Sequence, residues 1–237
     1  MRQPRVEVSP ELIKGQVMNC YNSLILDVRL ADNSLVPVFC GSSEAAGLCS
    51  VGMDAIIKRH RDGLRKIRYE LEFISRSEGL ILVNPTYNGF LFQEAFDNGI
   101  LSADFDAYNV CRRIEPDERL PHVDFELSSP SGNKCYVFIE NVFNKQNGCS
   151  VFPAGINFFE MAMFEELAKL RRQGHRTVIF MLVPRQDCVE AKFSWNLDPV
   201  AAARIYDEAK NGLEFVCYGC NIDKKSVTLA NKMKILY

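Results

Sequence analysis

The sequence predicts an α+β protein in two parts, a small β-barrel over residues 1–80 and an α/β domain over residues 81–237. Two observations lead to this prediction. Short apolar segments separated by polar turn signals fill the first third of the chain, whereas strand and helix patterns alternate between residues 134 and 222. The chain has 237 residues, 47% hydrophobic and 24% charged, so it is long enough for two small domains.

Four segments of the first part have the composition and the flanking turn residues of β-strands. They are SLILDVRL (23–30), LVPVFC (35–40), IRYELEFIS (67–75) and GLILVN (79–84). Apolar and charged residues alternate in the third segment, so one face of that strand is expected to carry Ile67, Tyr69, Leu71 and Phe73. Several short strands in close succession are typical of a closed or half-closed barrel.

The second part begins with a helix and a hairpin and then alternates strands with helices. Gly99 is a stop signal for the first helix, and the turn signal PSGN joins the two hairpin strands. The clearest helix has a 3.6-residue apolar period, with Asn157 as its cap. The expected elements are helix 88–101, strands 122–129 and 134–142, helix 157–174, strand 176–184, helix 198–212 and strand 213–222.

Composition excludes some functional classes and limits others. The net charge is −2, so only a local cluster of cations can indicate a nucleic-acid partner. No run of about 18 apolar residues predicts a membrane span, and the N-terminus lacks the apolar core of a signal peptide. Nine cysteines, an odd number spread along the chain, are expected to be reduced thiols, which predicts a cytoplasmic location.

The segment KRHRDGLRKIR (58–68) is the main local concentration of positive charge, with six Lys or Arg residues. On a small barrel these cations are expected to follow a phosphate backbone, with Tyr69 stacking on a base. The candidate nucleic-acid-binding residues are Lys58, Arg59, Arg61, Arg65, Lys66, Arg68 and Tyr69. The structural alternative is a solvated loop and strand edge.

The expected strand CYVFIENVF (135–143) carries one charged side chain, Glu140, among apolar residues. An ionised carboxylate left unpaired in an apolar layer costs about 3–5 kcal/mol. Glu140 is therefore expected either at a solvated strand end or in a functional site.

Eight segments, in their order and spacing, resemble the sugar fermentation stimulation protein A family over nearly the whole chain. They are SLILDVRL, VNPTYNGFLFQEAF, VDFEL, CYVFIENV, VFPAGI, GHRTVIFMLV, FSWNLDP and GLEFVCYGC. The resemblance implies an OB-type barrel followed by a domain of the PD-(D/E)XK nuclease class, and nucleic-acid binding or nuclease activity. Nucleases of that class hold Mg²⁺ with an Asp on one strand and the Glu of Glu-x-Lys on the next, while the Lys helps to activate water.

The resemblance places the metal-binding Asp at Asp124, but the next strand departs from the family pattern. Phe138 stands where family members carry the Glu, and Glu140 stands where they carry the Lys. The helix start NFFEMAM is apolar where they carry a polar run, so the pocket is expected to be filled by Phe138, Phe158 and Met161. The catalytic site is therefore predicted to be vestigial and to need no cofactor.

Three hypotheses for function remain open. The first is a non-catalytic family member that binds single-stranded DNA or RNA, or a protein partner. The second is a metal-dependent nuclease in which Asp124 and Glu140 are catalytic and hold Mg²⁺ or Mn²⁺. The third is a structural subunit of a larger assembly. Without a metal, Asp124 is expected to accept backbone N–H bonds at a strand end, and Glu140 to lie at a solvated edge.

Overall fold

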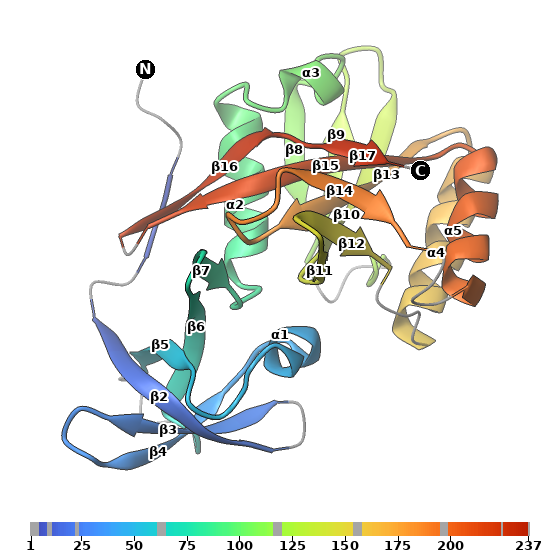
Figure 1. Cartoon of the computed structure of the whole chain (residues 1–237). Coiled ribbons are helices and arrows are strands. Elements are labelled where there is room, and N and C mark those ends of the chain that lie inside the picture. The colour runs from blue at the N-terminus through green and yellow to red at the C-terminus, as the bar shows by residue number, and fades with distance from the viewer. Residues whose placement is uncertain are drawn as a thin grey trace.

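The computed structural model describes residues 5–8, 11–21, 24–60, 65–115, 120–153, 158–194, 199–223 and 225–236, with the backbone alone at 158–160. It contains both predicted parts, a β-barrel at the bottom of Figure 1 and an α/β domain above it. None of the described helices is long and apolar enough to cross a membrane. All nine cysteines are free thiols.

The barrel is formed by strands in the order β4-β3-β2-β5-β6, and it is closed by parallel pairing between β4 and β6. Along the chain, a short helix lies between β4 and β5. The five strands with this helix form an OB-type barrel. The elements are β2 (Leu12–Tyr21), β3 (Ile25–Leu30), β4 (Leu35–Phe39), α1 (Ser43–Gly47), β5 (Asp54–Arg59), β6 (Tyr69–Arg76) and the added strand β7 (Gly79–Leu82). The buried side chains inside the barrel include Val17, Leu26, Val38, Ile57 and Leu71.

The α/β domain is built on a mixed sheet in the order β1-β16-β15-β13-β10-β9-β8. Its central strands β10, β13 and β15 are parallel and are connected through helices, as the sequence predicts. The elements are β1 (Val6–Glu7), α2 (Tyr87–Asp97), α3 (Ser102–Phe105), β8 (Val110–Arg113), β9 (Phe125–Ser128), β10 (Lys134–Asn141), α4 (Phe158–Arg172), β13 (Arg176–Val183), α5 (Pro199–Lys210), β15 (Leu213–Ile222) and β16 (Ser226–Lys232).

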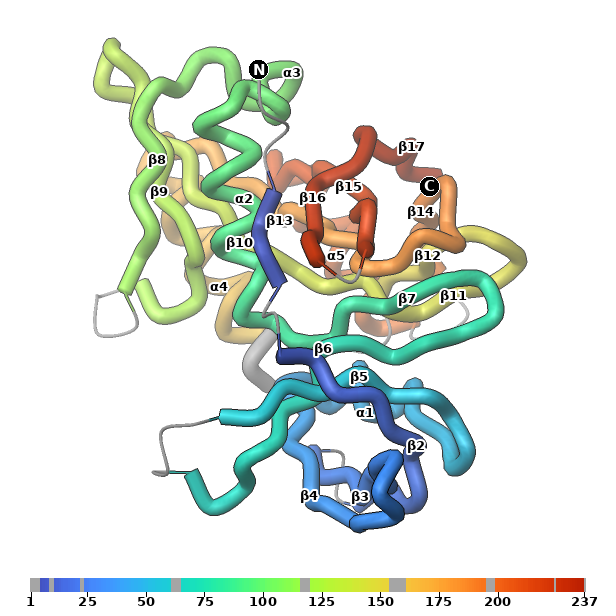
Figure 2. Tube along the Cα trace, turned by 90° about the vertical axis from the view of Figure 1, so that its left-hand side faces the viewer, coloured from blue at the N-terminus to red at the C-terminus, as the bar shows by residue number. Residues whose placement is uncertain are grey.

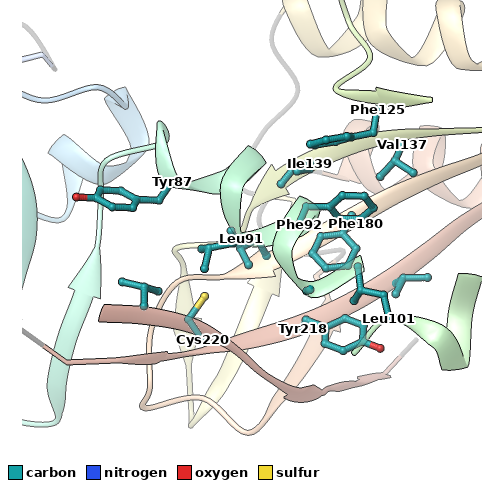
Figure 3. Packing of buried hydrophobic residues seen from close by; sticks show 14 of the residues in the cluster. Tyr87, Leu91, Phe92, Leu101, Phe125, Val137, Ile139, Phe180, Tyr218 and Cys220 are labelled. Atoms are coloured by element: carbon teal, nitrogen blue, oxygen red, sulfur yellow. The ribbon is translucent and has the colours of Figure 1, made fainter. Parts of the chain in front are cut away.

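Helices cover the two faces of this sheet, and each face has its own hydrophobic cluster. On one face Phe92 of α2 lies between Phe125 and Phe180, with ring centroids 4.7 and 5.0 Å away (Figure 3). On the other face Phe164 of α4 packs in the same cluster as Phe138 of β10. A smaller sheet adds to this second cluster; its strands are β11 (Lys145–Gln146), β12 (Cys149–Phe152), β14 (Glu190–Phe193) and β17 (Lys234–Leu236).

The two parts are joined at several points. Strand β1 precedes the barrel in sequence but pairs with β16 of the large sheet, beside which it runs in Figure 2. The amide of Leu82 donates to the carbonyl of Pro184 at 2.9 Å. Phe143, which follows β10, is buried in the barrel cluster. The boundary predicted at residue 80 stays a prediction.

The structure differs from the sequence-based expectation in three places. Strands β2 and β5 were not predicted, although both pair centrally in the barrel. The expected helix 88–101 is shorter, because α2 ends at Asp97 just before Gly99, whose φ is 73°, and α3 is a separate helix that begins at Ser102. A bulge where β5 meets β6 places Leu71 in the barrel cluster and Phe73 in a cluster of the α/β domain, so the prediction that they share one face is wrong.

Candidate functional site

Asp124 lies directly before β9 and next to the middle of β10. Its amide donates to the carbonyl of Val137 at 2.9 Å, and its carbonyl accepts from the amide of Ile114 at 2.8 Å. The regular pairing of β9 with β10 ends at Phe125 opposite Val137, and Asp124 bonds to that same Val137 just beyond the end. Phe138 and Glu140, two residues apart on β10, lie on one face of that strand, and Asp124 lies next to β10 where the regular pairing ends.

The Asp124 carboxylate is turned back onto the backbone of β10. Its Oδ2 accepts a hydrogen bond from the amide of Ile139 at 2.6 Å. Burial raises the pKa of Asp124, and the Ile139 amide and the positive charge of Arg113 offset part of this shift. Asp124 therefore has the contact expected of a strand-end carboxylate, and one of its two oxygens already has a backbone partner.

Phe138 occupies the position at which the resemblance implies a metal-binding carboxylate. The side chain is only 9% exposed and belongs to the cluster that α4 covers. The helix side chains in that cluster are Met163, Phe164, Leu167 and Leu170. Met161, which was expected to fill the pocket, is instead 37% exposed, because it lies half a turn from the buried stripe of the helix. The other expected residue, Phe158, has its side chain outside the described part.

Glu140 is half-buried near the end of β10, where it pairs with Met181 of β13. Within the residues that the structure describes, no group of three or more His, Cys, Asp or Glu side chains is placed to hold a metal ion. Mg²⁺ and Mn²⁺ require several oxygen ligands in near-octahedral geometry. Asp124 and Glu140, with Phe138 between them, do not fit that requirement.

The predicted basic cluster lies where β5 ends and β6 begins, at one end of the barrel. The side chains of Arg59, Arg65, Lys66 and Arg68 are exposed, and Lys58 is half-buried. The amide of His60 donates to the carbonyl of Arg68 at 2.7 Å, which holds the two chain segments together. Arg61 lies outside the described residues. The structure thus brings the described cations of the cluster to one end of the barrel.

A carboxylate lies among these cations. Oε2 of Glu70 is 2.7 Å from Nε2 of His60 and 3.7 Å from a guanidinium nitrogen of Arg65. Arg65 is therefore partly neutralised by Glu70, whereas Arg59, Lys66 and Arg68 are the cations that solvent reaches most directly.

Tyr69 is placed differently from the cations. It pairs with Val38 of β4 and with Arg59 of β5, and its half-buried side chain packs against the interior cluster of the barrel. Its role as a base-stacking residue stays a prediction. Tyr21 and Phe39 are exposed aromatic side chains on neighbouring strands of the barrel, and neither is among the residues predicted from the sequence. The signal was present in LVPVFC, where Val36, Val38 and Cys40 point inward and leave Phe39 on the outer face.

Comparison with known proteins agrees with the fold and with the resemblance. The family model described as "Sugar fermentation stimulation protein RE domain" matches residues 87–226. Sugar fermentation stimulation protein homologs of Maricaulis maris and Agrobacterium fabrum are 27% and 25% identical, over 95% and 96% of this chain and 96% and 95% of their own. The structure of Pyrococcus furiosus SfsA in complex with Ca²⁺ superposes with a TM-score of 0.84 at 17% identity, covering 98% of each chain. The chain belongs to the sugar fermentation stimulation protein A family.

Proposed function

We propose that this protein binds nucleic acid through its barrel and does not hydrolyse it. The observation that carries the proposal is the exposure of Arg59, Lys66 and Arg68 together at one end of an OB-type barrel. Barrels of this type bind oligonucleotides on an outer strand face and through the loops at its ends. The net charge of the chain is −2, so attraction to phosphates has to come from such a local cluster. Its free cysteines are in keeping with a cytoplasmic location, which forms part of the proposal.

The absence of hydrolysis in this proposal rests on Phe138. Phosphodiester hydrolysis by the nuclease class depends on a metal held by two carboxylates and on a lysine near the attacking water. Here Phe138 packs into a hydrophobic cluster at the position implied for one carboxylate, and Glu140 stands at the position implied for the lysine. Helix α4 closes over this cluster with Met163 and Phe164.

The binding part is tested with the salt dependence of affinity. Fluorescence anisotropy with a labelled single-stranded oligonucleotide gives log K against log salt for the wild type and for the combined variant Arg59→Ala, Lys66→Ala and Arg68→Ala. Each lost phosphate contact removes about 0.7 from the slope, so the variant slope is expected to be shallower by up to about 2.

A control variant makes the same charge change elsewhere. Lys169, Arg172 and Lys210 are exposed at the ends of α4 and α5, in the other part of the molecule. Their combined change to Ala is expected to leave the slope unchanged. Equal slopes in the wild type and the first variant, or no binding by the wild type at low salt, would overturn the proposal and favour a protein partner or a structural subunit of a larger assembly.

The second candidate function is a metal-dependent nuclease using Asp124 and Glu140. What favours it is that the two carboxylates lie on neighbouring chain segments, Asp124 directly before β9 and Glu140 near the end of β10. Incubation of single- and double-stranded DNA and RNA with Mg²⁺, Mn²⁺ or Ca²⁺ is expected to give no products above background. Products that depend on the metal and disappear in Asp124→Ala would place the nuclease first.

A further inference from the structure

A row of paired residues crosses the outside of the barrel from β2 to β5. Tyr21 pairs with Ile25, Ile25 with Phe39, Phe39 with Glu70, and Glu70 with Lys58. Paired residues on neighbouring strands point to the same face of a sheet. The row, called the outer row below, therefore follows the outer face of the barrel, and within it Glu70 is only 7% exposed. The outer row is aromatic and apolar at one end and charged at the other.

Burial confirms which way the outer row points. Leu26 and Val38, the chain neighbours of Ile25 and Phe39, are buried inside the barrel. Phe39 is 36% exposed and Tyr21 is 46% exposed. Strands β3 and β4 lie on the side of the barrel away from the α/β domain (Figure 1), so that domain does not cover the row.

Both rings stand on paired strands, and the Tyr21 ring has a further side-chain restraint. Phe39 lies on a strand that pairs on both sides, with β3 and with β6. The hydroxyl of Tyr21 donates to Oδ2 of Asp27 at 2.9 Å, which restrains the phenol ring against the outer face of β3. A ring that is already restrained loses little conformational entropy when a ligand packs on it.

The charged end of the outer row continues into the basic cluster. Arg65 contacts Glu70 at 3.7 Å, and Arg68 lies two residues before Glu70 on the same chain segment. A ligand that covers Phe39 and extends along the row toward β5 therefore reaches the cations within one strand spacing. Single-stranded nucleic acid has this combination of flat, apolar bases and anionic phosphates at short intervals.

We infer that the outer row is a base-stacking platform, with Phe39 and Tyr21 as the stacking residues, and that it makes the barrel selective for unpaired over paired strands. In a duplex the faces of the bases are covered by their neighbours, so only unpaired bases can stack on the two rings. The inference rests on the proposed function and adds the class of nucleic acid and the residues that recognise it. It also replaces Tyr69, whose ring lies against the barrel interior, as the main stacking residue.

The first test compares affinities for a single strand and for the matched duplex. Phe39→Leu keeps an apolar side chain of similar size and removes the aromatic ring, so it preserves the fold more safely than Ala. It is expected to weaken single-strand binding about tenfold, to leave duplex binding unchanged and to leave the salt slope unchanged. Tyr21→Leu is expected to act in the same direction. The matched control is Leu35→Ala, because Leu35 is 55% exposed on the same strand but outside the row.

The second test has a readout that is independent of affinity. Phe39→Trp places an indole at the same site, and its fluorescence is expected to be quenched when a single strand is added but not when a duplex is added. The difference from the wild type removes the contribution of Trp195. Sedimentation of each variant reports whether the row is instead a contact between copies of this chain.

The outcomes separate the two proposals. If the wild type binds no nucleic acid at low salt, the proposed function fails and this inference fails with it. If the wild type binds with a slope that depends on Arg59, Lys66 and Arg68, but Phe39→Leu and Tyr21→Leu bind single strands as tightly as the wild type, only the stacking inference is overturned. A change in oligomeric state in Phe39→Leu with unchanged affinity would also overturn it, in favour of a self-association surface.

Discussion

The strand ends around Asp124 and the β5–β6 end of the barrel are both places where charged side chains interrupt apolar strands, but their surroundings differ. Asp124 has a carboxylate bonded to the Ile139 amide and lies beside a buried phenylalanine. At the barrel end, Arg59 and Arg68 are exposed, and the exposed ring of Phe39 lies one strand away from Glu70. The first place is packed beside a buried side chain, whereas the second is exposed to solvent.

The difference shows that a single replacement affects a catalytic motif more than it affects a charged surface. Phe138 stands where the resemblance implies a metal-binding carboxylate, and it adds an apolar side chain to the cluster under α4. A basic surface depends on the sum of several cations, so no single replacement abolishes it. A chain can therefore lose hydrolysis and keep nucleic-acid binding, which is the combination proposed above.

The largest expected effect comes from restoring the carboxylate. Phe138→Glu buries a charge in the cluster under α4, and the expected loss in the free energy of unfolding at neutral pH is about 3–5 kcal/mol. Phe138→Leu is the control and is expected to lose about 1 kcal/mol. Urea denaturation measures both. Because burial raises the pKa of the new carboxyl, the loss in Phe138→Glu is expected to shrink as the pH falls toward the ordinary carboxyl pKa.

A different result would show that the Asp124 region, like the end of the barrel, is open to solvent. If Phe138→Glu loses less than about 1 kcal/mol and its melting temperature rises with Mn²⁺, the strand ends still form an open metal site. The double variant with Asp124→Ala would then lose the metal-dependent rise.

A smaller effect is expected at Asp124 itself. Asp124→Ala leaves the Ile139 amide without its acceptor, which is expected to cost about 1–2 kcal/mol. Asp124→Asn keeps an oxygen that can accept the bond. Burial raises the pKa of Asp124, so the folded chain holds this proton to higher pH than the unfolded chain does. The wild type is therefore expected to lose stability relative to Asp124→Asn as the pH rises through the raised pKa.

Urea denaturation of the wild type, Asp124→Asn and Asp124→Ala between pH 4 and pH 8 checks this order. If the carboxylate were held by a bound cation, its pKa would be lowered instead, and the wild type would gain stability over Asp124→Asn as the pH rises. The sign of that difference distinguishes a structural carboxylate from a metal ligand.

The sequence was sufficient for the elements with a strong local pattern. The helix expected over 157–174 is α4 (Phe158–Arg172), and the near-continuous apolar run at 176–184 is the doubly covered strand β13. Both follow from periodicity and burial, which depend on neighbours along the chain. The residue types also place Phe138, which cannot ligate a metal, beside Asp124, and the loss of catalysis that this implies stays a prediction.

Features that depend on pairing between distant segments could not be predicted. The bulge between β5 and β6 is visible only once Ile57 is paired with Leu71, and it leaves Glu72 fully buried. Asn84 donates to Oε1 of Glu72 at 3.1 Å, while burial raises the pKa of this carboxyl. The outer row likewise joins Tyr21 to Phe39 through two strand pairings that no local pattern contains.

The smallest expected effect concerns Glu70, the carboxylate within the outer row. Glu70→Gln keeps the shape of the side chain and removes a negative charge between Phe39 and Lys58. If phosphates pass along this row, single-strand affinity at low salt is expected to rise by about twofold, or about 0.5 kcal/mol, and the gain should fade as salt screens the charges. Glu165→Gln on the exposed side of α4 makes the same charge change as a control. Weaker binding in Glu70→Gln, or an equal gain in the control, would place the phosphate path away from the outer row.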